Sequence, residues 1–394
     1  MKLGLVLVTR DRTELAMSAI QSILSQEGGC ALDLIVSDNS STEEGARKLA
    51  EHCRSLGDPR VTWIRPPQSL PMPKHWDWAL EQALARSDAT HFGTQYDRKL
   101  WKPGELRVFA AACAADPALT VVAAYDAALQ TASGVEAWAM PVTGRLYEIR
   151  SAAIVRLTSR GMVHQLGYAY PLLSNCMVPR ATLERVRALF GTICDSATPD
   201  GAFTYRHTAV AERYLYLDRA AVIAHGYKFS NAFSYFRGDA GGTYGDWLKL
   251  WGDRPWLDAA PIPGLDLGLN IMFHEYGAVQ RVVGEEQFPP IDRKGYLREL
   301  SYGLRWIDDP ERQREMRRVL RRHGWREDER PLWRRLLSRV RQKIRPAPPA
   351  PPAPSLPTFA NDDEAVHYLL QPRPFTEQNP AIAPLEPVEV PFRA

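Results

Sequence analysis

Apolar and polar positions follow two alternating periods over the first 125 residues. Residues 3–8 form an unbroken apolar run, which predicts a strand buried on both faces. Asp11 and Glu14 then have the spacing of a capping box, and apolar residues recur at helical spacing from Leu15 to Leu24. This stretch therefore predicts a strand followed by a helix.

The same pattern returns further along the chain. It predicts strands at residues 32–37, 61–64, 90–94 and 119–125, and helices at 43–53, at 75–85 and from about 104. Successive βα units of this kind build a parallel sheet covered by helices on both faces. The predicted fold class is α/β.

The ends of these strands are the candidate binding positions. In open sheets of this type, ligands bind beyond the carboxyl ends of the strands. The segments that leave those ends are residues 9–12, 38–41 and 96–99. We expect all three to face one crevice.

The alternation fades after about residue 130. Helices are predicted at 181–190 and in a segment that ends near 214, residues 225–238 are dense in aromatic side chains, and residues 309–345 have a helical, Arg-rich pattern. The proline-rich run 346–357 must be extended, and the residues after it indicate a mostly disordered or docked tail. We expect three parts: residues 1–240, a helical extension at 241–345, and a largely disordered linker and tail at 346–394.

Charge is distributed unevenly along the chain. The net charge is only +3, but residues 301–345 contain fourteen Arg and one Lys against seven acids, so the rest of the chain carries about −5. Within this region, residues 332–345 place apolar side chains on one helical face and six cations elsewhere. That pattern indicates a helix on an anionic membrane surface, or an amphipathic helix docked on the protein with a solvated basic face.

Cysteine usage and hydropathy indicate a compartment. The five cysteines are odd in number and lack CxxC spacing, which argues against a disulfide framework and against a zinc site. The apolar run at the N-terminus is too short for a signal peptide, and no stretch approaches the ~20 apolar residues of a membrane span. We expect a cytoplasmic protein, either free or peripheral on the inner face of the cytoplasmic membrane.

The two opening strand ends carry a resemblance. LVLVTRDRTELAMSAIQSIL followed by LDLIVSDNSST resembles the opening of family 2 glycosyltransferases of the GT-A fold, and PMPKHWDWALEQALARSDATHFGTQYD resembles the segment that leads to that family's metal motif. The resemblance covers residues 1–240, with five segments in the family's order. It implies a Rossmann-like, mostly parallel GT-A sheet, to which this chain adds a helical extension and a proline-rich tail.

The activity that the resemblance implies is that of a hexosyltransferase-like enzyme, EC 2.4. Such an enzyme transfers a sugar from a nucleotide-sugar donor to a hydroxyl of a glycan or lipid-linked acceptor, here in the assembly of a surface polysaccharide. The resemblance assigns the donor nucleotide to Thr9, Asp11, Arg12, Asp38, Asn39 and Asp97. Two of these have structural alternatives, because Asp38 could make only an Asx turn and Asp11 could only cap a helix.

SATPDGAF, residues 196–203, resembles the segment in which the family places its catalytic base. An inverting transfer needs a carboxylate that deprotonates the acceptor hydroxyl as it attacks the anomeric carbon. Asp200 is the candidate for this role. The alternative is that Asp200 only caps its helix.

The metal motif departs from the family pattern. The family has two or three acids here, whereas this chain has Asp97 followed by Arg98 and Lys99. A single carboxylate is a poor Mg²⁺ or Mn²⁺ site. In one interpretation Arg98 or Lys99 takes over part of the stabilisation of the leaving diphosphate, and Asp97 orients the ribose or sugar hydroxyls or retains a weakly held ion. In the alternative interpretation both cations point into solvent.

HGYKFSNAFSYFRG, residues 225–238, resembles a family segment near donor and acceptor. His225 is a candidate for the diphosphate, and Tyr227, Ser230 and Asn231 are candidates for the acceptor. Aromatic faces stack on sugar rings, but core packing is an equal alternative for this segment's aromatic residues: Tyr227, Phe229, Phe233 and Tyr235.

Three classes of protein remain after this sequence analysis. The first is a glycosyltransferase, and the second is a GT-A module that lost its metal site and only binds a nucleotide or a glycan. The third, a nucleic-acid-binding protein, is suggested only by the Arg-rich stretch and has no accompanying motif. We therefore expect no nucleic-acid partner.

Overall fold

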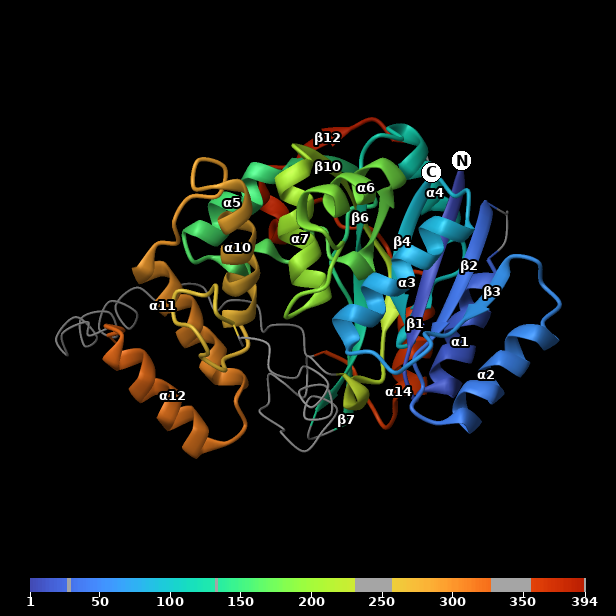
Figure 1. The fold of residues 1–394 in the computed structure, drawn as a ribbon, viewed down its shortest axis with the longest axis horizontal. Coiled ribbons are helices and arrows are strands. Elements are labelled where there is room, and N and C mark those ends of the chain that lie inside the picture. The colour runs from blue at the N-terminus through green and yellow to red at the C-terminus, as the bar shows by residue number, and fades with distance from the viewer. Residues whose placement is uncertain (27–29, 132–133, 231–256, 327–355, 393–394) are drawn as a thin grey trace.

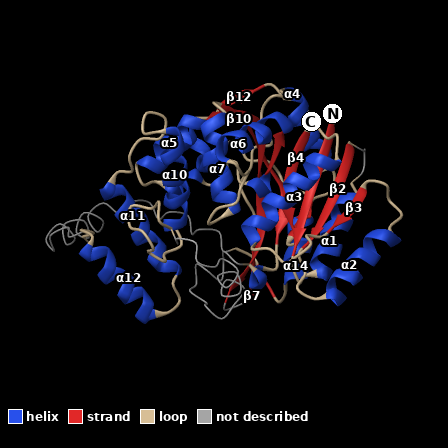
Figure 2. Ribbon diagram, in the orientation of Figure 1, coloured by secondary structure: helices blue, strands red, loops and turns tan. Residues whose placement is uncertain are grey.

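The computed structural model describes residues 1–26, 30–131, 134–230, 257–326 and 356–392 (Figure 1). One mixed sheet runs through this part of the protein in the order β12-β8-β10-β6-β9-β4-β1-β2-β3, with β5, β7 and β11 paired beside that path. Helices cover both faces of the sheet (Figure 2). The predicted α/β class is confirmed.

The first half of the sheet is parallel. Its strands are β1 (Lys2–Thr9), β2 (Ala31–Asp38), β3 (Val61–Ile64) and β4 (His91–Tyr96), and every pairing among them is parallel. Thr9 is opposite Asp38, and Val8 is opposite Tyr96. The carboxyl ends of three neighbouring strands therefore lie at one level.

Strand β1 is buried on both faces because its alternate side chains enter two different cores. Val6 and Val8 pack in the cluster that contains Trp76 and Leu80 of helix α3 (Met72–Arg86). The intervening leucines pack with apolar residues of helices α1 (Thr13–Leu24), α2 (Glu43–Ser55) and α4 (Glu105–Ala115). This explains why the strand reads as a continuous apolar run.

The capping box predicted at the start of α1 is wrong. The N-cap is Arg12, and no side chain caps the helix. Asp11 has a φ of 55°, and its Oδ1 accepts hydrogen bonds from the backbone N–H and hydroxyl of Ser41, at 2.7 and 3.0 Å. The carboxylate therefore ties the end of β1 to the loop after β2.

The second half of the sheet contains strands that the hydrophobic pattern missed. Strand β6 (Val121–Thr131) was predicted, but the longest strand, β10 (Arg213–Ala224), follows a segment where only a helix was expected. β10 pairs parallel with β6 and antiparallel with β8 (Leu146–Arg150) and β5 (Lys99–Trp101). β9 (Cys176–Pro179) pairs antiparallel with both β4 and β6 and joins the two halves.

The helices of the second half lie beside this mixed region. They are α5 (Ser151–Ser159), α6 (Arg180–Phe190) and α7 (Pro199–Val210), with the 3-10 turns η1 (Val163–Leu166), η2 (Leu173–Asn175) and η3 (Tyr227–Phe229). In the expected helical extension the structure has α10 (Asn270–Val283), α11 (Arg293–Gly303), η4 (Leu304–Trp306) and α12 (Pro310–Arg322). Tyr276 of α10 meets Tyr205 of α7 edge-on at 5.5 Å, within one shared core.

The C-terminal tail is docked from residue 356 to residue 392. β11 (Thr358–Phe359) pairs with β7 (Gly134–Trp138), and β12 (Val388–Val390) pairs with β8. Between them lie α14 (Asp362–Leu370) and η5 (Pro380–Leu385). Arg373 contacts the buried carboxylate of Asp126, and Asn379 donates to Asp218 at 2.8 Å. For these residues the expectation of a largely disordered tail is corrected, because the short apolar patch packs. Pro380 and Pro384 lie within η5, and the tail's other prolines lie in connections.

Two expectations fall outside the described residues. The basic helix predicted at 332–345 lies there, as does the proline run up to residue 355. Within the described ranges, the helices are too short or too polar to cross a membrane. All five cysteines lie in described segments and have free thiols.

We predict that Leu369→Ala lowers the free energy of unfolding by about 2–5 kcal/mol. Leu369 is fully buried in a cluster with Val135, Ala137 and Ile223, so truncation leaves a cavity. Chemical denaturation measures the change, and Val388→Ala, at a side chain 63% exposed, is the control. Equal stabilities of wild type and Leu369→Ala would show that helix α14 is not docked on the protein.

Candidate active site

One cavity of about 430 Å³ opens at the carboxyl ends of β1, β2 and β4. It collects side chains from segments that are far apart in the chain. Among the residues that the sequence singled out, its lining includes Thr9, Asp11, Arg12, Asn39, Asp97, Arg98, Asp200, Tyr227 and Ser230. The expectation that the three strand ends converge agrees with this lining. The segment around Asp200 lines the same cavity.

Asp97 is the centre of the strand-end side of the cavity. Its carboxylate is almost fully buried; Oδ2 accepts a hydrogen bond from the Thr9 hydroxyl at 2.8 Å, and Oδ1 lies 3.3 Å from Nη1 of Arg12. Both oxygens therefore have partners, and the negative charge is compensated by a guanidinium. The hydrogen bond from Thr9 to Asp97 also fixes the end of β1 against the turn after β4.

Asn39 and Arg10 hold a loop against this side of the cavity. The Asn39 side chain donates to the Leu70 carbonyl at 2.8 Å and accepts from the Leu70 N–H at 3.0 Å, as a paired backbone would. Arg10 donates to the Ser69 hydroxyl at 2.8 Å. The loop before α3 is thereby closed over the ends of β1 and β2.

Asp38 does not line the cavity. It is fully buried, and its Oδ1 accepts from the N–H and the hydroxyl of Ser40 at 2.9 and 2.6 Å, which is the Asx turn considered as an alternative. Its Oδ2 is buried without a hydrogen-bond partner in the described part of the chain. In this structure one oxygen of Asp38 makes the Asx turn, and its predicted contact with the donor nucleotide stays a prediction.

Arg98 presents a buried cation to the cavity. Its guanidinium lies over the rings of Tyr96 and Tyr227 at 4.9 and 5.5 Å, and Nη1 donates to the His225 carbonyl at 3.2 Å. Its Nε is buried and has no partner among the described residues. The side chain is 8% exposed, so the interpretation that Arg98 points into solvent is wrong.

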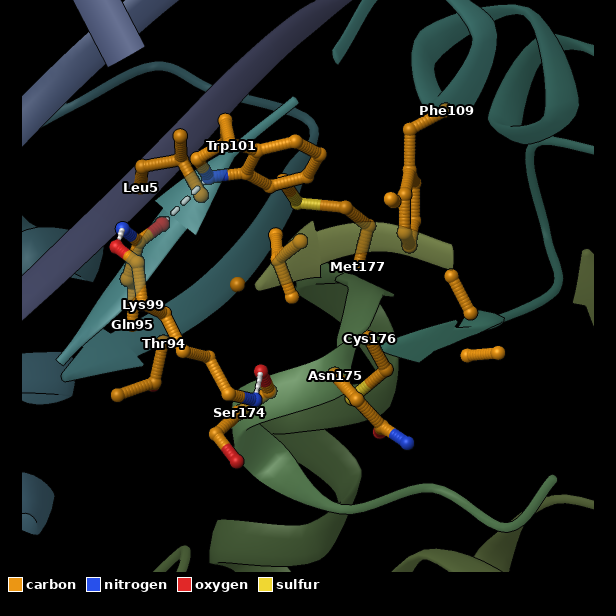
Figure 3. Close-up of a pocket in the computed structure, with 15 residues that line it drawn as sticks. Leu5, Thr94, Gln95, Lys99, Trp101, Phe109, Ser174, Asn175, Cys176 and Met177 are labelled. Carbon is orange, nitrogen blue, oxygen red and sulfur yellow. Dashed lines mark hydrogen bonds between the residues drawn. The ribbon is translucent and has the colours of Figure 1, made fainter. Parts of the chain in front are cut away.

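Lys99 and His225, the other two diphosphate candidates, lie outside the lining of this cavity. Lys99 is 1% exposed and reaches the Ser174 carbonyl instead (Figure 3). His225 is buried at the end of β10, and this burial lowers the pKa of its imidazole. In this structure neither residue reaches the cavity lining, and their predicted contacts with the diphosphate stay predictions.

Asp200 lies in the first turn of α7, where Pro199 precedes it. Its Oδ1 accepts hydrogen bonds from the N–H and the hydroxyl of Ser174, at 3.2 and 3.0 Å, and its side chain is partly exposed to the cavity. Burial raises the pKa of the carboxyl, and the charge of Lys99 and the Ser174 hydrogen bonds act in the opposite direction. The group is a carboxylate aimed at the cavity, with one oxygen fixed.

Two buried carboxylates hold the loop that leads to Asp200. Oδ1 of Asp77 accepts from the N–H groups of Ile193 and Cys194, at 2.7 and 2.8 Å. Oε1 of Glu275 in α10 accepts from the N–H of Thr198 at 2.8 Å. Gly201 permits this close approach, because a Cβ there would lie 3.1 Å from the sulfur of Met272 and 2.6 Å from a Thr198 methyl.

The acceptor candidates are divided by the limits of the described chain. Tyr227 and Ser230 line the cavity, while Asn231, Phe233 and Tyr235 lie outside the described residues. Phe229, in the same 3-10 turn, is 37% exposed and is not part of the lining. The aromatic segment therefore contributes at least one ring to the cavity.

Sequence reasoning missed three polar lining residues outside its candidate segments, His75, Tyr125 and Ser174, and both loop carboxylates. Of the lining residues, His75 bonds the Ser37 hydroxyl at 2.8 Å, and burial lowers the pKa of its imidazole to about 3. The usable signal was an ionisable residue on a buried helix face, which applies to three of them: His75, Asp77 and Glu275. No local signal marks the other two: Tyr125 and Ser174.

The residues present do not fit a divalent metal ion. Mg²⁺ and Mn²⁺ prefer several oxygen ligands, and Asp97 is one carboxylate whose two oxygens already have partners. Arg12 and Arg98 line the same wall and would repel a dication. Across the described ranges, no group of three or more His, Cys, Asp or Glu is placed to hold a metal.

In comparisons with family models and with curated proteins, nothing matches this chain. Among solved structures, it is similar to S. aureus TarS, with 13% identity and a TM-score of 0.44 over 80% of this chain and 50% of that chain. TarS 1-349 in complex with UDP has 12% identity and a TM-score of 0.43, covering 80% of this chain and 83% of that one. TarS 1-349 in complex with UDP-GlcNAc has 13% identity and a TM-score of 0.42, covering 80% and 84%. This chain thus spans half the length of the longer TarS chain.

We predict that the stability difference between Glu275→Gln and wild type depends on pH. Burial raises the pKa of Glu275 from its ordinary 4.5 to about 7, so the folded state holds a proton that the unfolded state releases between these values. Wild-type stability therefore falls, relative to Glu275→Gln, as pH rises through this window, by about 3 kcal/mol in total.

Urea denaturation at several pH values between 5 and 8 measures this difference. Glu286→Gln, on an exposed turn after the same helix, controls for the removal of one acid. If the difference in unfolding free energy between Glu275→Gln and wild type did not change with pH over this range, the loop would not contain a buried, destabilising carboxylate.

Proposed function

We propose that the protein is an inverting glycosyltransferase that transfers a sugar from a nucleotide-sugar donor to a hydroxyl of a glycan or lipid-linked acceptor in surface polysaccharide assembly. One observation carries the proposal: a single cavity is lined both by the strand-end residues Thr9, Asn39 and Asp97 and by a carboxylate from a distant segment of the chain, Asp200. Ligands of open α/β sheets bind at such strand ends, and a displacement at an anomeric carbon needs a base across from them.

The proposed chemistry is one displacement. Asp200 accepts the proton of the acceptor hydroxyl while its oxygen forms a bond to the anomeric carbon. The bond from that carbon to the phosphate oxygen breaks, and the electron pair leaves with the nucleoside diphosphate. The Ser174 hydrogen bonds fix Oδ1 of Asp200, so Oδ2 is the proposed proton acceptor.

The leaving diphosphate gains negative charge, which a preorganised cation can stabilise. Arg98 is suited to this role because it lines the cavity, is held over two aromatic rings and has a buried Nε without a partner in the described chain. Arg12 adds a second guanidinium, although it is shared with Asp97. The proposal therefore commits to charge stabilisation by arginine.

A module that binds nucleotide without transferring sugar is the second candidate. It is favoured by one observation, the engagement of both Asp97 oxygens within the protein. Thermal-shift titration with a panel of nucleoside diphosphates and nucleotide sugars reports binding. UDP and UDP-GlcNAc, which the TarS crystals contain, are the first members of this panel. Binding without turnover of any donor would favour the module.

We predict that Asp200→Asn lowers the turnover number for transfer or donor hydrolysis by about 10²- to 10⁴-fold, because an amide cannot take the proton. Donor affinity should change little, since the donor-side residues lie on other segments. In wild type the rate should fall as pH decreases through a pKa above the usual aspartate range, because burial raises the pKa of this base.

Steady-state kinetics with a radiolabelled donor measures these changes. Glu184→Gln, at an exposed position of α6, is the matched control and should behave as wild type. Wild-type kinetics in Asp200→Asn would exclude Asp200 as the base.

We predict that activity persists in excess EDTA and depends on Arg98. Arg98→Met should lower the turnover number by about 10²-fold, as the loss of one transition-state donor does elsewhere. Initial rates with EDTA, Mg²⁺ or Mn²⁺ test the metal requirement, and Arg107→Met, an exposed arginine of α4, is the control. Loss of activity in EDTA that Mn²⁺ restores would overturn the metal-independent mechanism.

A further inference from the structure

Lys99 is a cation buried behind the cavity wall. It begins strand β5, is 1% exposed, and borders a separate small cavity of about 20 Å³ rather than the large one. Within the described chain it forms no salt bridge. A buried charge without an adjacent counter-ion is costly, so its surroundings must compensate for it.

Three neighbours provide direct contacts to the ammonium. Nζ donates to the Ser174 carbonyl, as Figure 3 shows, and lies over the rings of Tyr96 and Tyr125 at 4.7 and 4.8 Å. Burial lowers the pKa of Lys99 to about 8, which leaves the side chain mostly protonated at pH 7. Both rings line the large cavity, so the charge lies directly behind its aromatic wall.

Ser174 connects this cation to Asp200. Its carbonyl accepts from Lys99, while its N–H and hydroxyl donate to Oδ1 of Asp200 at 3.2 and 3.0 Å. One residue of the η2 turn therefore contacts the cation on one side and the carboxylate on the other. Any shift of the lysine would be transmitted to the two donors that orient Asp200.

Among the titratable groups of the described ranges that interact electrostatically with Asp200, Lys99 is the cation. The others come from β4, β9 and two loops, and they are Tyr96, Cys176, Tyr170 and Cys194. Glu275 of α10 packs beside the next residue, Gly201, and is retained in every variant compared below. Burial raises the pKa of each of these phenols and thiols, so they are neutral near pH 7. The apolar surroundings favour a protonated Asp200, and Lys99 opposes them.

We propose that Lys99 is a positioning residue that acts through Ser174 to keep Asp200 ionised and oriented, instead of contacting the diphosphate. This inference rests on the proposed function, because it assigns Asp200 the role of base. It gives the two adjacent cations separate tasks. Arg98 serves the leaving group, and Lys99 serves the base.

Lys99→Met retains most of the side-chain volume and removes the charge. An opposite charge close to a carboxyl lowers its pKa by about 1–3 units, so its removal should move the acid limb of the pH–rate profile upward by about one pH unit or more. The plateau rate at high pH should fall less than the rate at pH 6. Lys99→Arg retains the charge and should keep the limb near its wild-type position.

Arg98→Met is the comparison variant for this experiment. It removes the neighbouring cation, which lines the cavity, and should lower the rate at every pH without moving the acid limb. Ser174→Ala removes the hydroxyl donor but retains Lys99, and should move the limb upward by less than Lys99→Met does. A general loss of packing would not produce this ordered set of shifts.

A titration without turnover provides the second measurement. The full-length protein is labelled with ¹³C at the aspartate carboxyls and studied by NMR. The Asp200 resonance is identified as the one that is missing from the spectrum of Asp200→Asn. The pH midpoint of the Asp200 titration should rise in Lys99→Met, and it should rise by less in Ser174→Ala. If circular dichroism shows that Lys99→Met is unfolded, Ser174→Ala and Lys99→Arg still decide the outcome.

The inference would be overturned if Lys99→Met changed neither the acid limb of the pH–rate profile nor the titration midpoint of Asp200. If Lys99→Met does not fold, the same two measurements on Ser174→Ala decide. So would an equal upward shift in Arg98→Met. If wild type has no transferase activity while the NMR midpoint still shifts, the proposed function fails and the coupling of Lys99 to Asp200 remains. The two failures are therefore distinguishable.

Discussion

The parallel, in-register pairing of β1 with β2 and β4 is the constraint on which the site depends. Because Thr9 is opposite Asp38 and Val8 is opposite Tyr96, the next residue after each strand emerges at the same edge. The Thr9 hydroxyl can then bond Asp97 across 88 residues of sequence. A register slip in either strand would exchange the two faces of β1 between its two cores, so hydrophobic packing enforces the same alignment that builds the cavity.

The ionisable groups around the cavity are arranged by burial. Asp97, Arg98 and Lys99 are each at most 8% exposed, and all three have partners within the protein. Asp97 contacts a hydroxyl and a guanidinium. Arg98 and Lys99 each contact two aromatic rings and a backbone carbonyl. Electrostatic interactions are stronger in such a setting than in water. Charges there can act on a leaving group or a base without first reorganising solvent.

The wall that carries Asp200 depends on segments outside the parallel half. Helix α10, late in the chain, supplies Glu275 to the loop before α7, and Asp77 of α3 holds the same loop from the other direction. The tail adds strands β11 and β12 and contacts the buried Asp126. The N-terminal half thus provides one side of the cavity, and the position of the other side depends on packing between distant elements.

The sequence by itself determined the α/β class, the parallel strands and the candidates at their ends, because hydrophobic periodicity and turn residues are local properties of the chain. The resemblance of residues 196–203 to a family segment selected Asp200, and that residue does line the cavity. Only the tertiary structure decided that Asp38 closes a turn, that Lys99 faces Ser174, and that Glu275 reaches the loop before Asp200. Strands β5 and β10 and the docked tail could not be predicted, because their hydrogen-bond partners lie far away in sequence. Such distant partners also set the direction of a buried polar side chain.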